Sequence, residues 1–213
     1  MSRGKSKKVQ GTKQTLEFVE EEKKLHVKQI KCMNSRQKEF LNAINSHEVT
    51  ICSGTPGSGK TFLSLFAFLK MLEKNQIEQI LLVKSVTQIP HEEVGFLKGS
   101  LEEKLDPIMQ SYWHNIDKII GEEQRKNLIT KGKIKVVPLA FIRGCQYDNA
   151  GLIMDEVQNI SLDIFKSLMT RIGYNSKYIF LGDVEQCDLH NKKDAALSKL
   201  MKIFENDENV GIV

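Results

Sequence analysis

Eight consecutive residues of this chain have the types and spacing that can hold a phosphate group. They fit the pattern G-x-x-x-x-G-K-[ST] and are Gly54, Thr55, Pro56, Gly57, Ser58, Gly59, Lys60 and Thr61. The three glycines allow backbone conformations that a Cβ disfavours, so successive N–H groups can surround phosphate oxygens. The lysine can reach the β- and γ-phosphates, and the threonine hydroxyl can bind Mg²⁺. This P-loop predicts binding of a nucleoside triphosphate together with Mg²⁺.

The segments on either side of the P-loop favour this interpretation. Residues 47–52 are typical of a β-strand that enters the loop, and residues 62–72 form an apolar, helix-type stretch that leaves it. A helix that begins at the loop adds the positive end of its dipole to the phosphate site. The alternative, a glycine-rich surface turn, does not require this strand and helix context.

Two adjacent acids follow a second apolar run. Leu152, Ile153 and Met154 lead directly into Asp155 and Glu156. In a P-loop domain the first acid is suited to hold Mg²⁺, directly or through water, and the second can polarise the water that attacks the γ-phosphate. Taken alone, the run is typical of an ordinary strand that ends in solvated charge. Together with the P-loop it favours hydrolysis over binding alone.

A third strand-type run, at 178–182, enters a Gly-Asp turn, and Gln186 follows three residues after Asp183. A carboxamide in this position could lie at the γ-phosphate and distinguish a triphosphate from a diphosphate. The signal is weak by itself, because strands commonly end in such turns.

From Asn34 onward, strand-like and helix-like runs alternate along the chain. This order predicts an α/β domain with a mainly parallel sheet and helices on both faces. The expected strands are 48–53, 79–84, 134–138, 151–155 and 178–182, and 209–213 could add a last one. The expected helices are one that Ser35 caps and that passes through Leu41 and Ile44, then 60–73, most of 100–131, 161–171 and about 193–205. Pro107 is expected to start or kink a helix, and residues 85–99 to form a loop.

Composition is that of an ordinary globular domain. The 213 residues are 40% hydrophobic and 27% charged, which is enough to bury one substantial core. We expect a basic, flexible segment at 1–33 and one P-loop domain at 34–213. No apolar run approaches the roughly 18 residues of a membrane span, and no signal peptide is recognisable, so a cytoplasmic protein is expected. The cysteines and histidines are scattered, which argues against a metal cage and for reduced thiols.

Charge is concentrated at the beginning of the sequence. Residues 1–13 hold five basic side chains and no acid, while the net charge of the whole chain is +4, so the other 200 residues sum to −1. A basic arm can contact nucleic-acid phosphates, although such tails are also often only solvated. Nucleic acid is therefore one candidate partner.

Several motifs, in one order along the chain, resemble the PhoH family. They are the P-loop, GFLKG at 95–99 with EKLDP at 103–107, IRG at 142–144, DEVQN at 155–159, TRIG at 170–173 with Ser176-Lys177, and GDVEQCDL at 182–189. The resemblance covers roughly residues 34–205. It implies a RecA-like P-loop ATPase akin to the first motor domain of superfamily 1 helicases, found in bacteria and phages. It also implies ATP hydrolysis, a connection to RNA or single-stranded DNA, and a homo-oligomer such as a ring.

The same resemblance implies roles for particular residues. Gln37 matches a glutamine that recognises adenine, which favours ATP over GTP, and Gln186 matches a γ-phosphate sensor. Asp155 and Glu156 take the magnesium and catalytic roles given above. Arg143 and Arg171 match family arginines, each of which could bind nucleic acid, brace the fold, act on a neighbouring subunit's phosphate or form a surface ion pair.

Two other function classes are kept as alternatives. A nucleotide-switched binding module with little or no turnover needs the same P-loop, and the basic arm permits binding without turnover. A GTPase is suggested by Asn191, Lys192 and Asp194, which fit N-K-x-D, but no apolar strand precedes them and DEVQ stands where D-x-x-G is expected.

Overall fold

A computed structural model describes residues 24–84, 101–142, 144–186 and 196–213. Within these ranges, all six strands belong to one sheet in the order β3-β2-β4-β5-β1-β6, and all neighbouring pairs are parallel. The strands are β1 (Val49–Ser53), β2 (Gln79–Lys84), β3 (Ile134–Pro138), β4 (Ala150–Met154), β5 (Lys177–Gly182) and β6 (Val210–Ile212). The α/β fold with a parallel sheet is thus confirmed.

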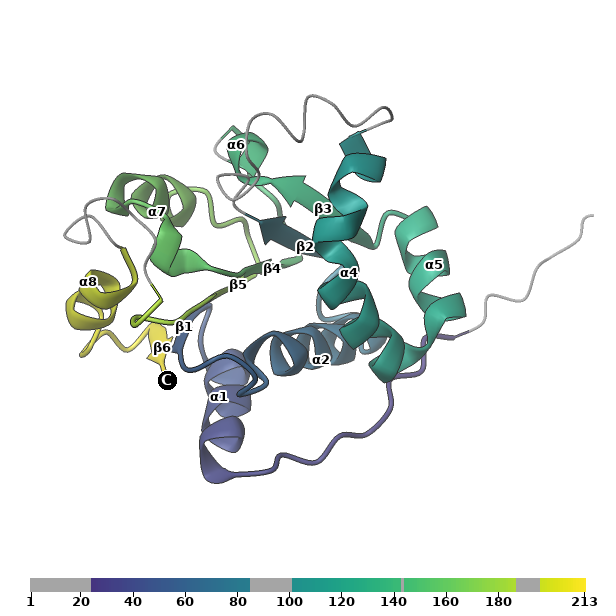
Figure 1. Ribbon diagram of the computed structural model, residues 1–213, viewed down its shortest axis with the longest axis horizontal. Coiled ribbons are helices and arrows are strands. Elements are labelled where there is room, and N and C mark those ends of the chain that lie inside the picture. Colours follow the sequence, from purple (N-terminus) through teal and green to yellow (C-terminus); the bar gives the residue numbers. More distant parts are fainter. Residues whose placement is uncertain (1–23, 85–100, 143, 187–195) are drawn as a thin grey trace, which may run out of the picture.

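Helices cover both faces of this sheet (Figure 1). On one face lie α1 (Ser35–Ser46), α2 (Lys60–Glu73), α4 (Leu101–Ile120) and α5 (Glu122–Thr130). On the other lie α6 (Leu139–Ile142), the 3₁₀ turn η2 (Val157–Asn159), α7 (Leu162–Met169) and α8 (Ala196–Ile203). The fold is therefore a three-layer arrangement with two apolar cores.

Strand β2 shows why the strands of this sheet are continuous apolar runs in the sequence. Ile80 and Leu82 pack into the core beneath α2 and α4, whereas Leu81 and Val83 pack into the core on the opposite face. Successive side chains of a strand point to opposite faces, and in a parallel sheet both faces are covered. All four side chains are accordingly buried.

The parallel sheet brings the chemically interesting residues to one edge. The P-loop follows β1, Asp155 follows β4 and Asp183 follows β5, and β5 pairs with both of the other strands. Since all strands run in the same direction, their carboxyl ends lie at the same edge, where ligands of open α/β sheets bind. The backbone N–H of Gly54 donates to the carbonyl oxygen of Gly182 at 3.1 Å and joins two of these loops.

Some element boundaries differ from the expectation. The cap of α1 is Asn34, whose side chain accepts the N–H of Gln37, and Ser35 is already helical. Helix α4 begins at Leu101 and runs through Pro107, so the helix does not start at the proline. The break between α4 and α5 comes at Gly121, which has φ 84°. The loop expected at 85–99 and residues 193–195 of the last expected helix lie outside the described residues.

Residues 24–33, which we call the strap, contain neither helix nor strand but lie against the domain. The Val27 side chain is only 1% exposed and belongs to the core beneath α2 and α4. In Figure 1 the strap runs from beside α5 to the start of α1. Within the described part of the chain, none of the helices has the length and apolar character needed to cross a membrane.

Candidate nucleotide-binding site

The P-loop joins the end of β1 to the start of α2. Gly57 and Gly59 have φ of 77° and 92°, the left-handed region that favours glycine, and Gly59 is the residue that caps α2. Gly54 does not share this conformation, and a Cβ on it would meet its nearest neighbour, the Ser58 Oγ, at 3.4 Å. The special backbone expected at three glycines is therefore required at two of them.

The Lys60 ammonium lies inside the curve of the loop. Its Nζ donates to the carbonyl oxygens of Gly54 and Thr55, the latter at 3.0 Å. The ammonium thus lies among the loop's polar backbone groups.

Asp155 receives hydrogen bonds from three directions. Its Oδ2 accepts from Thr61 Oγ1 at 2.8 Å and from the Tyr112 hydroxyl at 3.4 Å, and its Oδ1 accepts from the Glu156 N–H at 3.0 Å. Burial, and then the charge of Asp155, raise the pKa of Tyr112, which keeps this hydroxyl protonated as a donor. Tyr112 lies on α4 and has no signal in the sequence motifs.

The hydroxyl of Thr61 and the carboxylate of Asp155 form a donor set that fits Mg²⁺. Both are hard oxygen ligands, and their contact brings them close enough to share one cation. Among the described residues there is no group of three or more His, Cys, Asp or Glu side chains arranged around a metal position. Mg²⁺ keeps several waters and phosphate oxygens and needs only one or two protein ligands, which Thr61 and Asp155 can supply.

Glu156 has an unusual backbone and a fixed side chain. Its φ of 61° is left-handed, which is uncommon for a residue with a Cβ and concentrates at functional sites. Its Oε2 accepts from Gln158 Nε2 at 2.7 Å, and Gln158 Oε1 accepts the Asp183 N–H at 3.2 Å. Gln158, only 2% exposed, therefore links the loops after β4 and β5. The DEVQN run contains it, but the sequence alone assigns it no role.

A cavity of about 400 Å³ collects these side chains. Predicted residues that line it are Pro56, Gly57, Gly59, Lys60, Thr61, Asp155, Glu156 and Gln186. The other lining residues, to which the sequence assigned no role, are Phe62, Asn115, Gln158, Gly182 and Asp183. Asn115 shares α4 with Tyr112, so the sequence gives no spacing that would link either residue to the P-loop.

Arg171 is not among the described residues that line this cavity. Arg143 lies outside the described residues. Arg171 is exposed just after α7, and its carbonyl oxygen accepts from the hydroxyl of Tyr178 at 3.0 Å. Tyr178 stands near the start of β5, whereas Gly182 at the end of β5 lines the cavity. Arg171 is therefore near the opposite edge of the sheet.

A second cavity of about 550 Å³ lies on the other side of the P-loop. Its walls are Asn34, Arg36, Gln37, Phe40, Cys52, Ser53, Gly54, Thr55, Ser58, Lys60, Leu63, Met201, Ile212 and Val213. Gln37 Nε2 donates to the carbonyl oxygen of Ser58 at 3.0 Å, so this side chain touches the loop itself. Burial raises the pKa of Cys52 to about 12, which leaves a neutral thiol in a largely apolar wall. A planar ring that is apolar on its faces and carries polar atoms at its edge would fit a cavity with such a wall.

Comparison with known proteins identifies relatives. The model of the family described as "PhoH-like protein" matches residues 29–213. A PhoH-like protein of Synechocystis sp. is 35% identical over 181 residues, which cover 85% of this chain and 55% of that protein. Protein PhoH of Escherichia coli (strain K12) is 33% identical over 182 residues, which cover 84% of this chain and 51% of that protein. The chain thus spans about half the length of these relatives.

Solved structures show weaker likeness. The large terminase of the HK97 bacteriophage aligns with a TM-score of 0.48 and 13% identity over 87% of this chain and 40% of that one. The Sulfolobus solfataricus SWI2/SNF2 ATPase core in complex with dsDNA aligns with a TM-score of 0.44 and 15% identity. This alignment covers 84% of this chain and 36% of that one. The fold assignment rests on the chain's own parallel sheet and P-loop. By its sequence over residues 29–213, the chain belongs to the PhoH-like family.

Proposed function

We propose that this chain is a Mg²⁺-dependent ATPase whose activity is coupled to RNA or single-stranded DNA. The observation that carries the ATPase assignment is the gathering of Lys60, Thr61, Asp155 and Glu156 around one cavity at the carboxyl edge of the sheet. A cation, a metal-ligand pair and a candidate base are the groups that hydrolysis of a phosphoanhydride requires.

Binding of ATP would exchange partners within the P-loop. Lys60 Nζ would leave the carbonyl oxygens of Gly54 and Thr55 for oxygens of the β- and γ-phosphates. Thr61 and Asp155 would hold Mg²⁺, which when bound neutralises charge on the same phosphate oxygens. Gln186, on the rim formed by the loop after β5, would contact the γ-phosphate.

Glu156 is the proposed general base. It would take a proton from a water whose oxygen bonds to the γ-phosphorus, while the bond from that phosphorus to the β–γ bridging oxygen breaks and yields ADP and phosphate. Gln158 holds the Glu156 carboxylate by a hydrogen bond of 2.7 Å, which supports a fixed orientation for this side chain.

The second cavity is the proposed base pocket, with Gln37 as the residue that reads adenine. Its position beside Ser58 of the P-loop supports this role, because a nucleotide held at the phosphates would extend its base into the adjoining space. The apolar side chains of Phe40, Leu63 and Ile212 can pack against the ring.

Coupling to RNA or single-stranded DNA is supported by the five basic side chains of residues 1–13 and by the family resemblance. The place of Arg171 supports an assembly of several copies. Because this arginine is near the opposite edge of the sheet, a nucleotide phosphate that it contacts would belong to a neighbouring subunit, whereas a nucleic-acid phosphate need not.

The test is steady-state ATP hydrolysis with and without single-stranded RNA and DNA, together with nucleotide binding. Lys60→Ala should lose both turnover and affinity for ATP. Glu156→Gln should still bind ATP while its turnover falls by about 100-fold, the usual contribution of a general base. Lys166→Ala, which removes an exposed lysine of α7, is the matched control and should behave as the wild type.

Three outcomes separate the alternatives. Turnover that survives Lys60→Ala would show that the activity does not come from this site. ATP binding without turnover in the wild type, with or without nucleic acid, would favour the nucleotide-switched binding module. Turnover that neither RNA nor DNA changes would leave an ATPase with another partner.

A further inference from the structure

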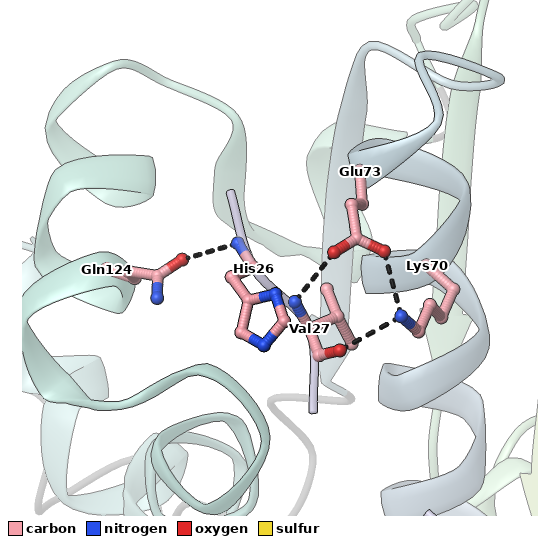
Figure 2. Close-up of polar contacts among 5 residues, drawn as sticks. All are labelled: His26, Val27, Lys70, Glu73 and Gln124. Carbon is pink, nitrogen blue, oxygen red and sulfur yellow. Dashed lines mark hydrogen bonds and ion pairs between the residues drawn. The ribbon is translucent and has the colours of Figure 1, made fainter. Parts of the chain in front are cut away.

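The strap is held against the P-loop helix by a clamp around a single residue (Figure 2). The Val27 N–H donates to Glu73 Oε1 at 2.8 Å, and the Val27 carbonyl oxygen accepts from Lys70 Nζ at 2.9 Å. Lys70 and Glu73 also pair with each other at 2.8 Å. Both polar groups of one backbone residue are thus bound by a pair of opposite charges on α2.

This ion pair differs from the surface pairs of the molecule. The Lys70 and Glu73 side chains are 21% and 19% exposed, whereas those of Lys126 and Glu122 on α5 are 66% and 63% exposed. Exposed pairs contribute little, because water competes for both charges. The clamp is shielded and is reinforced by Gln124 of α5, whose Oε1 accepts the His26 N–H at 2.9 Å.

The other end of the strap reaches the proposed base pocket. The Met33 N–H donates to Gln37 Oε1 at 2.7 Å, while Gln37 Nε2 donates to the Ser58 carbonyl oxygen at 3.0 Å. A backbone N–H pairs only with the oxygen of a carboxamide, and a carbonyl only with its NH₂ group. These two contacts therefore fix which side of the Gln37 carboxamide carries the oxygen.

A carboxamide fixed in this way distinguishes bases. The Gln37 Nε2 has two N–H donors and Oε1 has two acceptor lone pairs, and the contacts with Ser58 and Met33 occupy one of each. One N–H and one lone pair therefore stay available for a base. Adenine presents an acceptor at N7 beside the donor N6–H₂, which matches this pair, whereas guanine presents two acceptors, N7 and O6. Hypoxanthine, the base of ITP, also carries O6 in place of the amino group.

We propose that Glu73 and Lys70 are positioning residues for base recognition, acting through the strap on Gln37. This inference rests on the proposed function, because it requires ATP to bind at the P-loop. The clamp holds one end of the strap at Val27, and the Met33 N–H at the other end holds the carboxamide that reads the base. Val27 lies ahead of residues 29–213, the part that the family model matches, whereas Lys70 and Glu73 lie within it.

The test compares the affinities of the full chain for ATP and ITP by calorimetry. Wild type should prefer ATP, and Glu73→Ala should reduce the ATP-to-ITP ratio by about fivefold, the value of one ordinary hydrogen bond. Glu73→Gln keeps an acceptor for the Val27 N–H and should retain most of the ratio. Glu122→Ala, which removes a glutamate from an exposed pair, is the control and should keep the wild-type ratio.

Affinity for inorganic triphosphate separates base reading from general damage, and it should be the same in Glu73→Ala and wild type. An unchanged ATP-to-ITP ratio in folded Glu73→Ala, or a wild type without preference, overturns the inference. Should Glu73→Ala fail to fold, Lys70→Met, which keeps the aliphatic stem, is measured in the same way and read by the same criteria. If wild type binds no ATP, or if Lys60→Ala binds it equally well, the proposed function itself is wrong.

Discussion

Two features of the P-loop require a glycine at position 59: the backbone conformation and the short distance to the Gln37 side chain. Its φ of 92° lies in the left-handed region, and it stands against the side chain that we assign to base reading. A Cβ at this position would lie 3.2 Å from Gln37 Nε2, closer than ordinary packing allows. The residue is therefore constrained by backbone conformation and by space at the same time.

We predict that Gly59→Ala lowers the free energy of unfolding by about 1–2 kcal/mol, the strain of a left-handed residue with a Cβ. It should also weaken ATP binding, because Gln37 must move. Gly54→Ala is the matched comparison within the loop, since Gly54 has no positive φ, and its Cβ would meet only side-chain atoms, at 3.4 Å or more. Urea denaturation of both variants checks this, and equal stabilities would contradict the prediction.

At the residue scale, sequence reasoning succeeded where chemistry follows from local spacing. Lys60, Thr61, Asp155 and Glu156 stand in short motifs, and the structure gathers all four at one cavity. Tyr112 was missed because its contact with Asp155 joins positions far apart in the chain. No spacing rule connects such residues, and only the packing of α4 beside the P-loop helix brings them together.

Helix α2 is the element on which the site depends, and it packs very closely on the sheet. Gly151 of β4 lies under the ring of Phe68, and a Cβ added to this glycine would come within 2.6 Å of the ring. The absence of a side chain at Gly151 therefore sets how near α2, and with it the P-loop, can approach the strand that leads to Asp155.

We predict that Gly151→Ala destabilises the fold by about 1–3 kcal/mol, the usual effect of overpacking a core. Adding Phe68→Leu should recover part of the loss, because the smaller side chain makes room. Gly144→Ala is the control, since its nearest neighbour would be a carbonyl oxygen at 4.0 Å. Midpoints of urea unfolding measure all three, and a double variant no more stable than Gly151→Ala would argue against this packing account.

Element boundaries show where local rules are too weak. The predicted cap, Ser35, is wrong by one residue, because Asn caps a helix as well as Ser does and Asn34 takes that position. Pro107 predicts a helix start or a kink, and α4 already begins at Leu101. The later turns of α4 bury Met109, Tyr112, Ile116 and Ile119, and this packing offsets the hydrogen bond that a proline removes. The strands were placed to within a residue or two because continuous apolar runs define them.

On the scale of the whole molecule, the clamp connects stability to pH. The hydrogen bond from Lys70, and then the one from the Val27 N–H, lower the pKa of Glu73 from its ordinary value of 4.5. A carboxyl with a lowered folded-state pKa contributes stability that is present above the unfolded value and is lost as pH falls through the folded value. Acid should therefore release the strap.

We predict that, between about pH 5 and pH 3, wild type loses more stability than Glu73→Gln, whose neutral side chain does not titrate. Glu122→Gln should follow wild type more closely, because its pair is exposed and screened by water. Thermal unfolding at each pH checks this. Parallel pH profiles for wild type and Glu73→Gln would mean that the clamp makes no such contribution.

The second cavity has a consequence for how the protein is made. Its walls join residues near position 34 to residues near position 213, and the last strand is tied to β1 by hydrogen bonds between Val213 and both Ile51 and Ser53. Contacts between such distant positions form slowly, since a long segment must close first. During synthesis on the ribosome the P-loop is made before β6, the strand that supplies part of this cavity's wall. The proposed base pocket is therefore complete only after β6 has been made, later than the phosphate site, whose described lining ends at Gln186.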